Sequence, residues 1–102
     1  MMETIIELIE SNTFQENDFN PDCEGWQTVT WNIGIGSLYT IKATVNNVIN
    51  MVDVGTNSMG EQLSVDAGKI LIEDIISVHD YFGDEFEVSK EDVKLILNFL
   101  EI

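Results

Sequence analysis

The sequence predicts a single α+β domain, and three observations lead to this prediction. The chain has 102 residues, which is the length of one ordinary domain. Hydrophobic residues make up 44% of it, enough to form a buried core. Apolar residues recur with a helical period near both ends and with a period of two in the middle. The expected order over residues 1–102 is a short helix, a three-stranded antiparallel sheet and two C-terminal helices (αβββαα).

The first helix is predicted over Glu3–Glu10. Isoleucine and leucine side chains supply its apolar side, and the acids Glu3, Glu7 and Glu10 follow one another at helical spacing on the opposite side. A helix of fewer than three turns is marginal alone and must pack on another element. Residues 11–25 contain the turn-forming sequence around Pro21 and predict a loop.

Three strands are predicted next, over residues 26–35, 38–45 and 48–54. Turn residues 34–37 separate the first two, and Asn46-Asn47 is placed between the second and third as a two-residue hairpin turn. The predicted apolar faces are Val29, Trp31, Ile33 and Ile35 on the first strand and Tyr39, Ile41, Ala43 and Val45 on the second. Threonines dominate the opposite face, at Thr28, Thr30, Thr40 and Thr44.

Two helices are predicted to complete the chain. After a loop over residues 55–63, Ser64 can cap a helix over 65–82 with the apolar stripe Leu71, Ile72, Ile75, Val78 and Phe82. Gly83 is placed for its C-terminal cap. A strand over Lys69–Val78 remains open as an alternative, because isoleucine is abundant there. Ser89 and Asp92 have capping-box spacing and predict the start of the last helix, which buries Val93, Ile96, Leu97 and Leu100.

The charge excludes several classes of ligand. The chain has 19 acidic residues, four lysines and no arginine, for a formal net charge of −15. Four lysines cannot hold a nucleic-acid backbone or an anionic membrane surface against that repulsion, so neither is expected as a direct partner. The charge is also segregated. Residues 1–24 carry −7, residues 25–52 carry +1 and residues 53–102 carry −9.

The cysteine and histidine content argues against disulfides and zinc. Cys23 is the only cysteine and His79 the only histidine, so an internal disulfide cannot form and a structural zinc site lacks ligands. The N-terminus has no secretory pattern and no apolar run is long enough to span a bilayer. We therefore expect a cytoplasmic protein (in the host's cytoplasm if a phage encodes it) with no metal, no cofactor and no enzymatic activity.

Three local patterns suggest chemistry only weakly. Residues 18–24 place oxygen ligands at alternate positions, but Cys23 and Val29 stand where a calcium loop of the EF-hand type needs glycine and glutamate. A nucleophilic pair of Cys23 and His79 has no supporting signature around either residue. Residues 34–36 read Gly-Ile-Gly after a strand, but the third glycine of a dinucleotide-binding fingerprint is absent.

An acidic cluster in the C-terminal third is the strongest functional signal. Eight carboxylates fall within residues 73–92 against one base, Lys90, and most of them lie at or near the junction of the last two predicted helices. A solvated acidic face would explain them, and so would a surface that imitates the phosphate array of nucleic acid and attracts a basic groove on a partner. Phe86 could anchor such a contact. The predicted contact residues are Asp80, Asp84, Glu85, Glu87, Glu91 and Asp92.

In element order, length and acidity the chain resembles the small phage-borne anti-CRISPR proteins that block Cas9. Some of these inhibitors look like imitations of DNA. The resemblance spans the chain but includes no shared motif, and it implies a non-enzymatic inhibitor of a basic nucleic-acid-binding protein such as a Cas nuclease. Acidic immunity proteins that neutralise nuclease toxins are similar in the same respects. A third hypothesis is an adaptor or subunit that docks through the threonine face of the sheet near Trp26. The sequence leaves the oligomeric state open.

Overall fold

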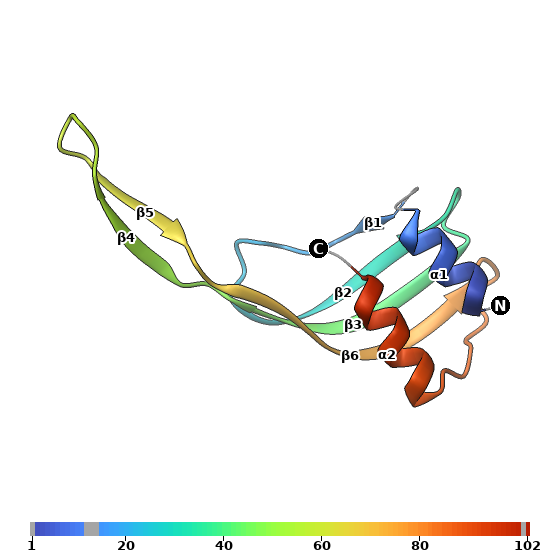
Figure 1. Ribbon diagram of the computed structural model, residues 1–102. Coiled ribbons are helices and arrows are strands. Elements are labelled where there is room, and N and C mark those ends of the chain that lie inside the picture. Colours follow the sequence, from blue (N-terminus) through green and yellow to red (C-terminus); the bar gives the residue numbers. More distant parts are fainter. Residues whose placement is uncertain (1, 12–14, 101) are drawn as a thin grey trace.

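The structure, a computed structural model, describes residues 2–11, 15–100 and 102. In this part of the chain it contains two short helices and six strands that form two antiparallel sheets (Figure 1). The elements are α1 (Met2–Glu10), β1 (Glu16–Asn17), β2 (Gly25–Ile33), β3 (Tyr39–Val48), β4 (Met51–Thr56), β5 (Gln62–Asp66), β6 (Lys69–Asp80) and α2 (Lys90–Phe99). The predicted αβββαα order is therefore wrong, because strands replace the second predicted helix.

The body of the molecule is a four-stranded sheet with strand order β1-β2-β3-β6, and both helices lie side by side on one of its faces (Figure 1). The predicted pairing of the first two long strands is confirmed, with Trp31 opposite Ile41 in β2 and β3. The core lies between the sheet and the helices. Its fully or almost fully buried side chains are Ile5, Ile9, Val29, Trp31, Ile33, Ile41, Ala43, Val45, Ile75, Val78, Ile96 and Leu100.

A two-stranded ribbon projects from this body (Figure 1). It consists of β4, β5 and the turn between them, residues 51–66, and we call it the arm. β3 leads into β4 and β5 leads into β6, so the arm prolongs two neighbouring strands of the sheet. The molecule measures 56 × 25 × 20 Å and its radius of gyration is 17.1 Å, against about 13 Å for a compact domain of this length.

The hairpin turn predicted at Asn46-Asn47 is wrong. Both residues lie inside β3, which continues to Val48, and the chain reverses direction at the tip of the arm instead. Asn47 is buried, and its side-chain amide donates hydrogen bonds to the carbonyl oxygens of Pro21 (3.2 Å) and Cys23 (2.8 Å). Asn47 therefore does not form a turn but holds a neighbouring loop against the sheet.

The helix predicted over residues 65–82 is wrong, and the strand alternative for Lys69–Val78 agrees with β6. Two β-bulges explain the error. The register with β3 skips Ile76 and Glu73, so the β6 residues that face the core are Ile72, Ile75 and Val78, three apart instead of two. That spacing imitates one face of a helix. Gly83 has a positive φ of 84°, but it lies in the turn that follows β6 and caps no helix.

The first and last helices agree with the sequence. α1 buries Ile5 and Ile9. Ser89 caps α2, and its side-chain oxygen accepts a hydrogen bond from the backbone N–H of Asp92 at 3.2 Å. Neither described helix is long and apolar enough to cross a membrane.

Candidate functional site

The acidic cluster begins at a tight turn where β6 ends. The carboxylate Oδ1 of Asp80 accepts hydrogen bonds from the backbone N–H groups of Phe82 and Asp84, both at 2.9 Å. The backbone N–H of Asp80 also donates to the carbonyl oxygen of Asp84 at 3.0 Å. These bonds close residues 80–84 into one fixed loop. Asp80 therefore shapes the loop from within, whereas the side chain of Asp84 is exposed.

The chain then turns back along the end of β6. Glu85 forms a β-bridge with His79, and the backbone N–H of Phe86 donates to the carbonyl oxygen of Val78 at 2.8 Å. Phe86 packs against the core and its ring lies 6.2 Å from that of Tyr39. The backbone of residues 85 and 86 is thus held against the sheet, which fixes where the neighbouring acidic side chains leave the backbone.

A groove of 610 Å³ lies between this segment, the end of β6 and the start of α2. Its apolar lining comes from Ile75, Ile76, Phe86, Val88 and Val93. The two exposed carboxylates Glu85 and Glu87 also line it. The groove therefore combines apolar side chains with a largely polar accessible lining that includes two carboxylates, which suits a basic side chain with a hydrocarbon stem, as lysine and arginine have.

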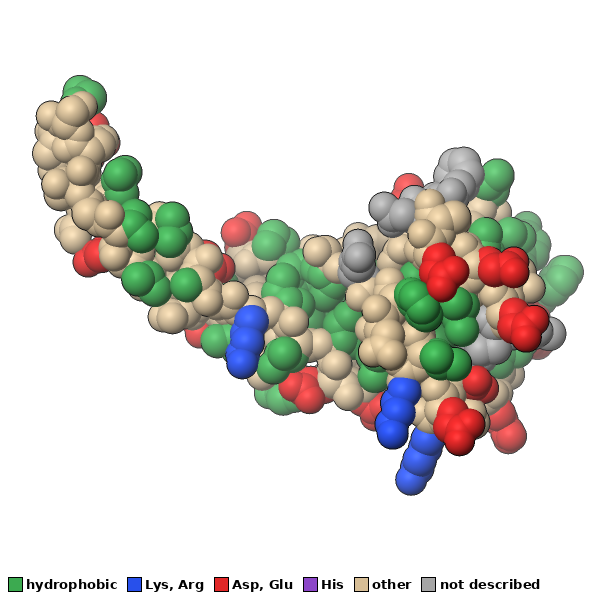
Figure 2. All heavy atoms as spheres, viewed as in Figure 1, with side chains coloured by type: hydrophobic (Ala, Val, Ile, Leu, Met, Phe, Trp, Pro, Cys, Tyr) green, Lys and Arg blue, Asp and Glu red, His purple; other side chains and the backbone are tan. Residues whose placement is uncertain are grey.

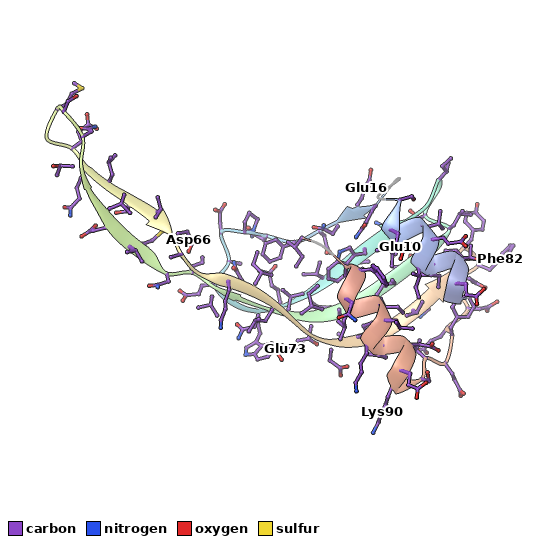
Figure 3. All side chains as sticks on the ribbon, in the orientation of Figure 1. Glu10, Glu16, Asp66, Glu73, Phe82 and Lys90 are labelled. Carbon is purple, nitrogen blue, oxygen red and sulfur yellow. The ribbon has the colours of Figure 1, made fainter. Side chains whose placement is uncertain are left out.

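Two aromatic rings stand exposed beside the acids. Tyr81 is 64% exposed and Phe82 is 84% exposed, and their rings meet edge to face at 5.4 Å. Figure 3 shows Phe82 at the end of the molecule opposite the arm. With Leu38, Tyr39 and Phe86 they line a second hollow of 240 Å³. Exposed aromatic rings with a polar surround are the usual anchors of protein interfaces.

The structure brings four of the six predicted contact residues to the surface. Asp84, Glu85, Glu87 and Glu91 are exposed, whereas Asp80 and Asp92 are half-buried. The predicted junction of two helices is wrong, because these residues connect a strand to a helix. In consequence, the carboxylates of residues 73–85 do not follow a helical face.

Acidic groups also line the helical layer. Glu3, Glu7 and Glu10 on α1 are exposed, at a helical spacing of about 5–6 Å. Because α1 and α2 lie side by side on the same face of the sheet, this row and Glu91 share one layer. Figure 2 shows acidic side chains gathered on and around the helices, and hydrophobic side chains together with a few acidic ones along the arm. The largest group of acidic side chains therefore lies on the body, although the arm also carries three acids and no lysine.

The weaker chemical patterns do not assemble into sites. In the suspected calcium loop, the side-chain oxygen of Asn20 accepts from the backbone N–H of Asp22 at 3.1 Å, which is an ordinary Asx turn. Cys23 lies near Asn47 and His79 pairs with Thr40, seven residues away along β3, a separation of about 23 Å. Among the described residues, no three His, Cys, Asp or Glu side chains are arranged to hold a metal.

Two surface features were missed from the sequence. The helix predicted over residues 65–82 ends on Tyr81 and Phe82, although two adjacent aromatics before Gly83 in an acidic segment suggest an exposed turn. The arm was missed as well, although the short alternating runs 52–54 and 63–66 flank a turn sequence that contains Asn57 and Gly60. Alternation on both sides of such a turn is a hairpin signature.

Comparison with known proteins adds no relative: no protein-family model, curated protein or solved structure matches this chain. The candidate site is therefore defined by its own residues.

Proposed function

We propose that this protein is a small acidic inhibitor that binds a basic nucleic-acid-binding protein and occupies the surface where that partner holds phosphates. It acts by binding, without catalysis, in the cytoplasm. The observation that carries the proposal is the fixed segment that follows β6. There Asp84 follows a loop closed by Asp80, and Glu85 and Glu87 flank Phe86, whose backbone N–H is bonded to β6. A groove and two exposed aromatic rings lie beside these acids.

Charge supports this type of partner. With a net charge of −15, the protein repels acidic surfaces and is attracted to basic ones over the range of the Debye length. Because the backbone at residues 80–86 is already hydrogen-bonded, binding has to order mainly the side chains of these acids, which lowers the entropy cost and favours affinity. The row Glu3, Glu7 and Glu10 on α1 extends the negative surface over the helical layer.

The partner we consider first is a Cas nuclease, so that the role would be anti-CRISPR. This choice now depends on size and acidity alone, because the αβββαα order that contributed to the resemblance is not the order of the structure. A nuclease toxin neutralised by an immunity protein offers the same basic groove and is the alternative of the same class.

The test uses the purified protein against purified Cas nuclease loaded with its guide RNA, and against a nuclease captured on the immobilised protein from a lysate. Imitation of nucleic acid predicts three results together: inhibited DNA cleavage, displacement by duplex DNA, and binding that weakens steeply as salt rises from about 50 to about 500 mM. Binding that DNA cannot displace and that salt does not change would refute the proposal.

Two matched variants locate the surface. The triple variant D84N/E85Q/E87Q removes three charges at the fixed segment, and D22N/E24Q/E61Q removes three exposed charges elsewhere. We expect the first to weaken binding at least about tenfold more than the second, because close charge pairs count more than distant ones. Equal effects would mean that only the total charge matters.

One observation favours a second function, that of an adaptor that docks through the sheet. Trp26 on β2 is 63% exposed and lies opposite Asn46 on β3. Asn46 in turn lies opposite Leu71 on β6, and Leu71 is 39% exposed. A partner bound there through apolar contacts would be insensitive to salt. Replacing Trp26 by alanine would then abolish binding, and the triple acid variant would leave it unchanged.

A further inference from the structure

The connection between β6 and α2 lines a groove of 610 Å³ where it leaves the edge of the sheet. Figure 3 labels Phe82 and Lys90, which lie near the two ends of this connection. At Phe86 the connection is still held to β6, because the N–H of Phe86 donates to the carbonyl oxygen of Val78. Two residues later, Val88 already precedes the N-cap of α2. The backbone beside the groove is therefore held on one side by β6 and on the other by a helix cap.

The apolar lining of the groove is only partly covered. Ile75 is almost fully buried, whereas its neighbour Ile76 is 53% exposed. Ile76 is the residue that the register with β3 skips, and a bulge of this kind re-aims a side chain relative to regular strand alternation. Phe86, Val88 and Val93 are half-buried and complete the apolar lining. The groove therefore offers apolar surface that a hydrocarbon stem can cover.

The charged groups of the groove all have the same sign. Of the described residues that line it, Glu85 and Glu87 are acidic and none is basic. Both side chains are exposed, and they flank Phe86 in the chain. A cation is therefore the complementary ligand. Arginine fits these groups better than lysine, because its planar head has five N–H donors for two carboxylates and stacks on aromatic rings such as that of Phe86.

The groove adjoins the exposed aromatic rings. Phe86 also lines the second hollow of 240 Å³, together with Tyr81 and Phe82, so the two hollows share one side chain. The volume of the groove falls within the range of about 300–1,000 Å³ that is typical of ligand sites, which leaves room for one long side chain. The neighbouring rings provide a contact for the residues next to it. This continuity favours a stretch of protein over a free small cation.

We propose that the groove receives one arginine side chain of the partner protein, with its stem on the apolar lining and its guanidinium group between Glu85 and Glu87. This proposal rests on the proposed function, because the partner there is a basic nucleic-acid-binding protein, and it names the side chain that the site recognises. Arginine is a main phosphate-binding residue of such proteins. An arginine held in the groove is therefore withheld from the nucleic acid.

The test is an NMR titration of the full chain with n-butylguanidinium, which carries the head and the stem of arginine. The amide signals of Phe86, Glu87 and Val88 should shift with a dissociation constant of about 1–10 mM. Methylguanidinium has three fewer methylene groups, each worth about fourfold when buried, and should bind at least about tenfold more weakly. n-Butylammonium, which has the head of lysine, should bind at least about threefold more weakly. Equal affinities of n-butylguanidinium and either comparison compound, or shifts spread over all exposed carboxylates, overturn the proposal.

Two pairs of variants separate the charge of the groove from its apolar lining. E85Q/E87Q should weaken the binding of n-butylguanidinium at least about threefold, whereas E3Q/E7Q, which removes two exposed charges on α1, should leave it within about twofold of wild type. I76T should lower the ratio of n-butylguanidinium to methylguanidinium affinity at least about twofold. Its control is I70T, at an exposed isoleucine of the same strand outside the groove, and it should leave the ratio unchanged. Equal effects within either pair overturn the proposal.

The outcomes distinguish this proposal from the proposed function. If n-butylguanidinium does not bind in the groove while inhibition of a nuclease persists and DNA displaces the complex, the groove proposal is overturned and the proposed function stands. If n-butylguanidinium binds as expected and no nuclease is bound or inhibited, the preference of the groove for arginine is supported and the nucleic-acid-binding partner is overturned. If both hold, I76T should also weaken binding of that nuclease, and I70T should not.

Discussion

Gly68 is the residue whose replacement tests the geometry of the arm base most directly. A Cβ added at Gly68 would lie 1.7 Å from the carbonyl oxygen of Val48, whereas real Cβ contacts are essentially never closer than 3.0 Å. G68A therefore requires a displacement of at least 1.3 Å, the difference between these two distances. The obstacle is backbone and cannot rotate away. Val48 is paired with Lys69 where β3 meets β6, and the N–H of Gly68 is bonded to Asp66.

The expected cost follows from the bonds that such a displacement would break. Two or three backbone hydrogen bonds at about 1 kcal/mol each give a loss of about 2–3 kcal/mol in the free energy of unfolding. The control is G36A, where nothing lies within 4 Å and only the positive φ of 71° is unfavourable, which costs about 1–2 kcal/mol. Urea unfolding measures both variants, and amide hydrogen exchange shows whether protection is lost first at Asn50 and Gly68. A G68A protein within about 0.5 kcal/mol of wild type would refute this account of the arm base.

Two further predictions concern single hydrogen-bonded groups. S89A removes the N-cap of α2 and should cost about 1 kcal/mol of stability in urea unfolding, whereas S89D keeps a capping oxygen and should stay within about 0.5 kcal/mol of wild type. The second concerns pH. Because hydrogen bonds from the backbone N–H groups of Asn50 and Gly68 lower the pKa of Asp66 in the folded protein, its contribution to stability is complete above the unfolded pKa of about 3.9 and is lost as pH falls through the lower folded value. The amide NMR signals of Asn50 and Gly68 should titrate with a midpoint below about 3.9, and D66N should abolish that titration. A midpoint at or above the unfolded value would contradict it.

The parts of the fold that the sequence predicts are those where one local signal dominates. α2 has a capping serine and an acidic first turn, and β2 alternates cleanly between Val29, Trp31 and Ile33. β6 fails this test. Its bulges at Glu73 and Ile76 convert a period of two into a period of three, so periodicity alone selects the wrong element. The high content of β-branched residues in the same segment was the better indicator.

The candidate site was predictable in composition but not in arrangement. The exposed acids Asp84, Glu85 and Glu87 could be chosen from their density in the chain. The role of Asp80 could not, because it depends on a loop that returns its carboxylate to the N–H groups of Phe82 and Asp84. The sequence alone does not distinguish a carboxylate that accepts hydrogen bonds from its own backbone from one that is free to contact a partner.

The bulges that mislead the sequence also limit how another protein can bind. β6 is an edge strand of the four-stranded sheet, and such edges can pair with foreign strands. Here the bulged residue Glu73 and its neighbour Asp74 place two exposed carboxylates in the middle of that edge, and the bulge at Ile76 interrupts it again. Both the exposed carboxylates and the bulges oppose the addition of a continuous foreign strand to β6. Contacts with other molecules should therefore use side-chain surfaces, the acidic and aromatic end near Phe82 and the exposed apolar side chains of the arm. Binding through the acidic end weakens as salt rises, whereas binding through an apolar face changes little, so one salt series can distinguish which surface a given complex uses.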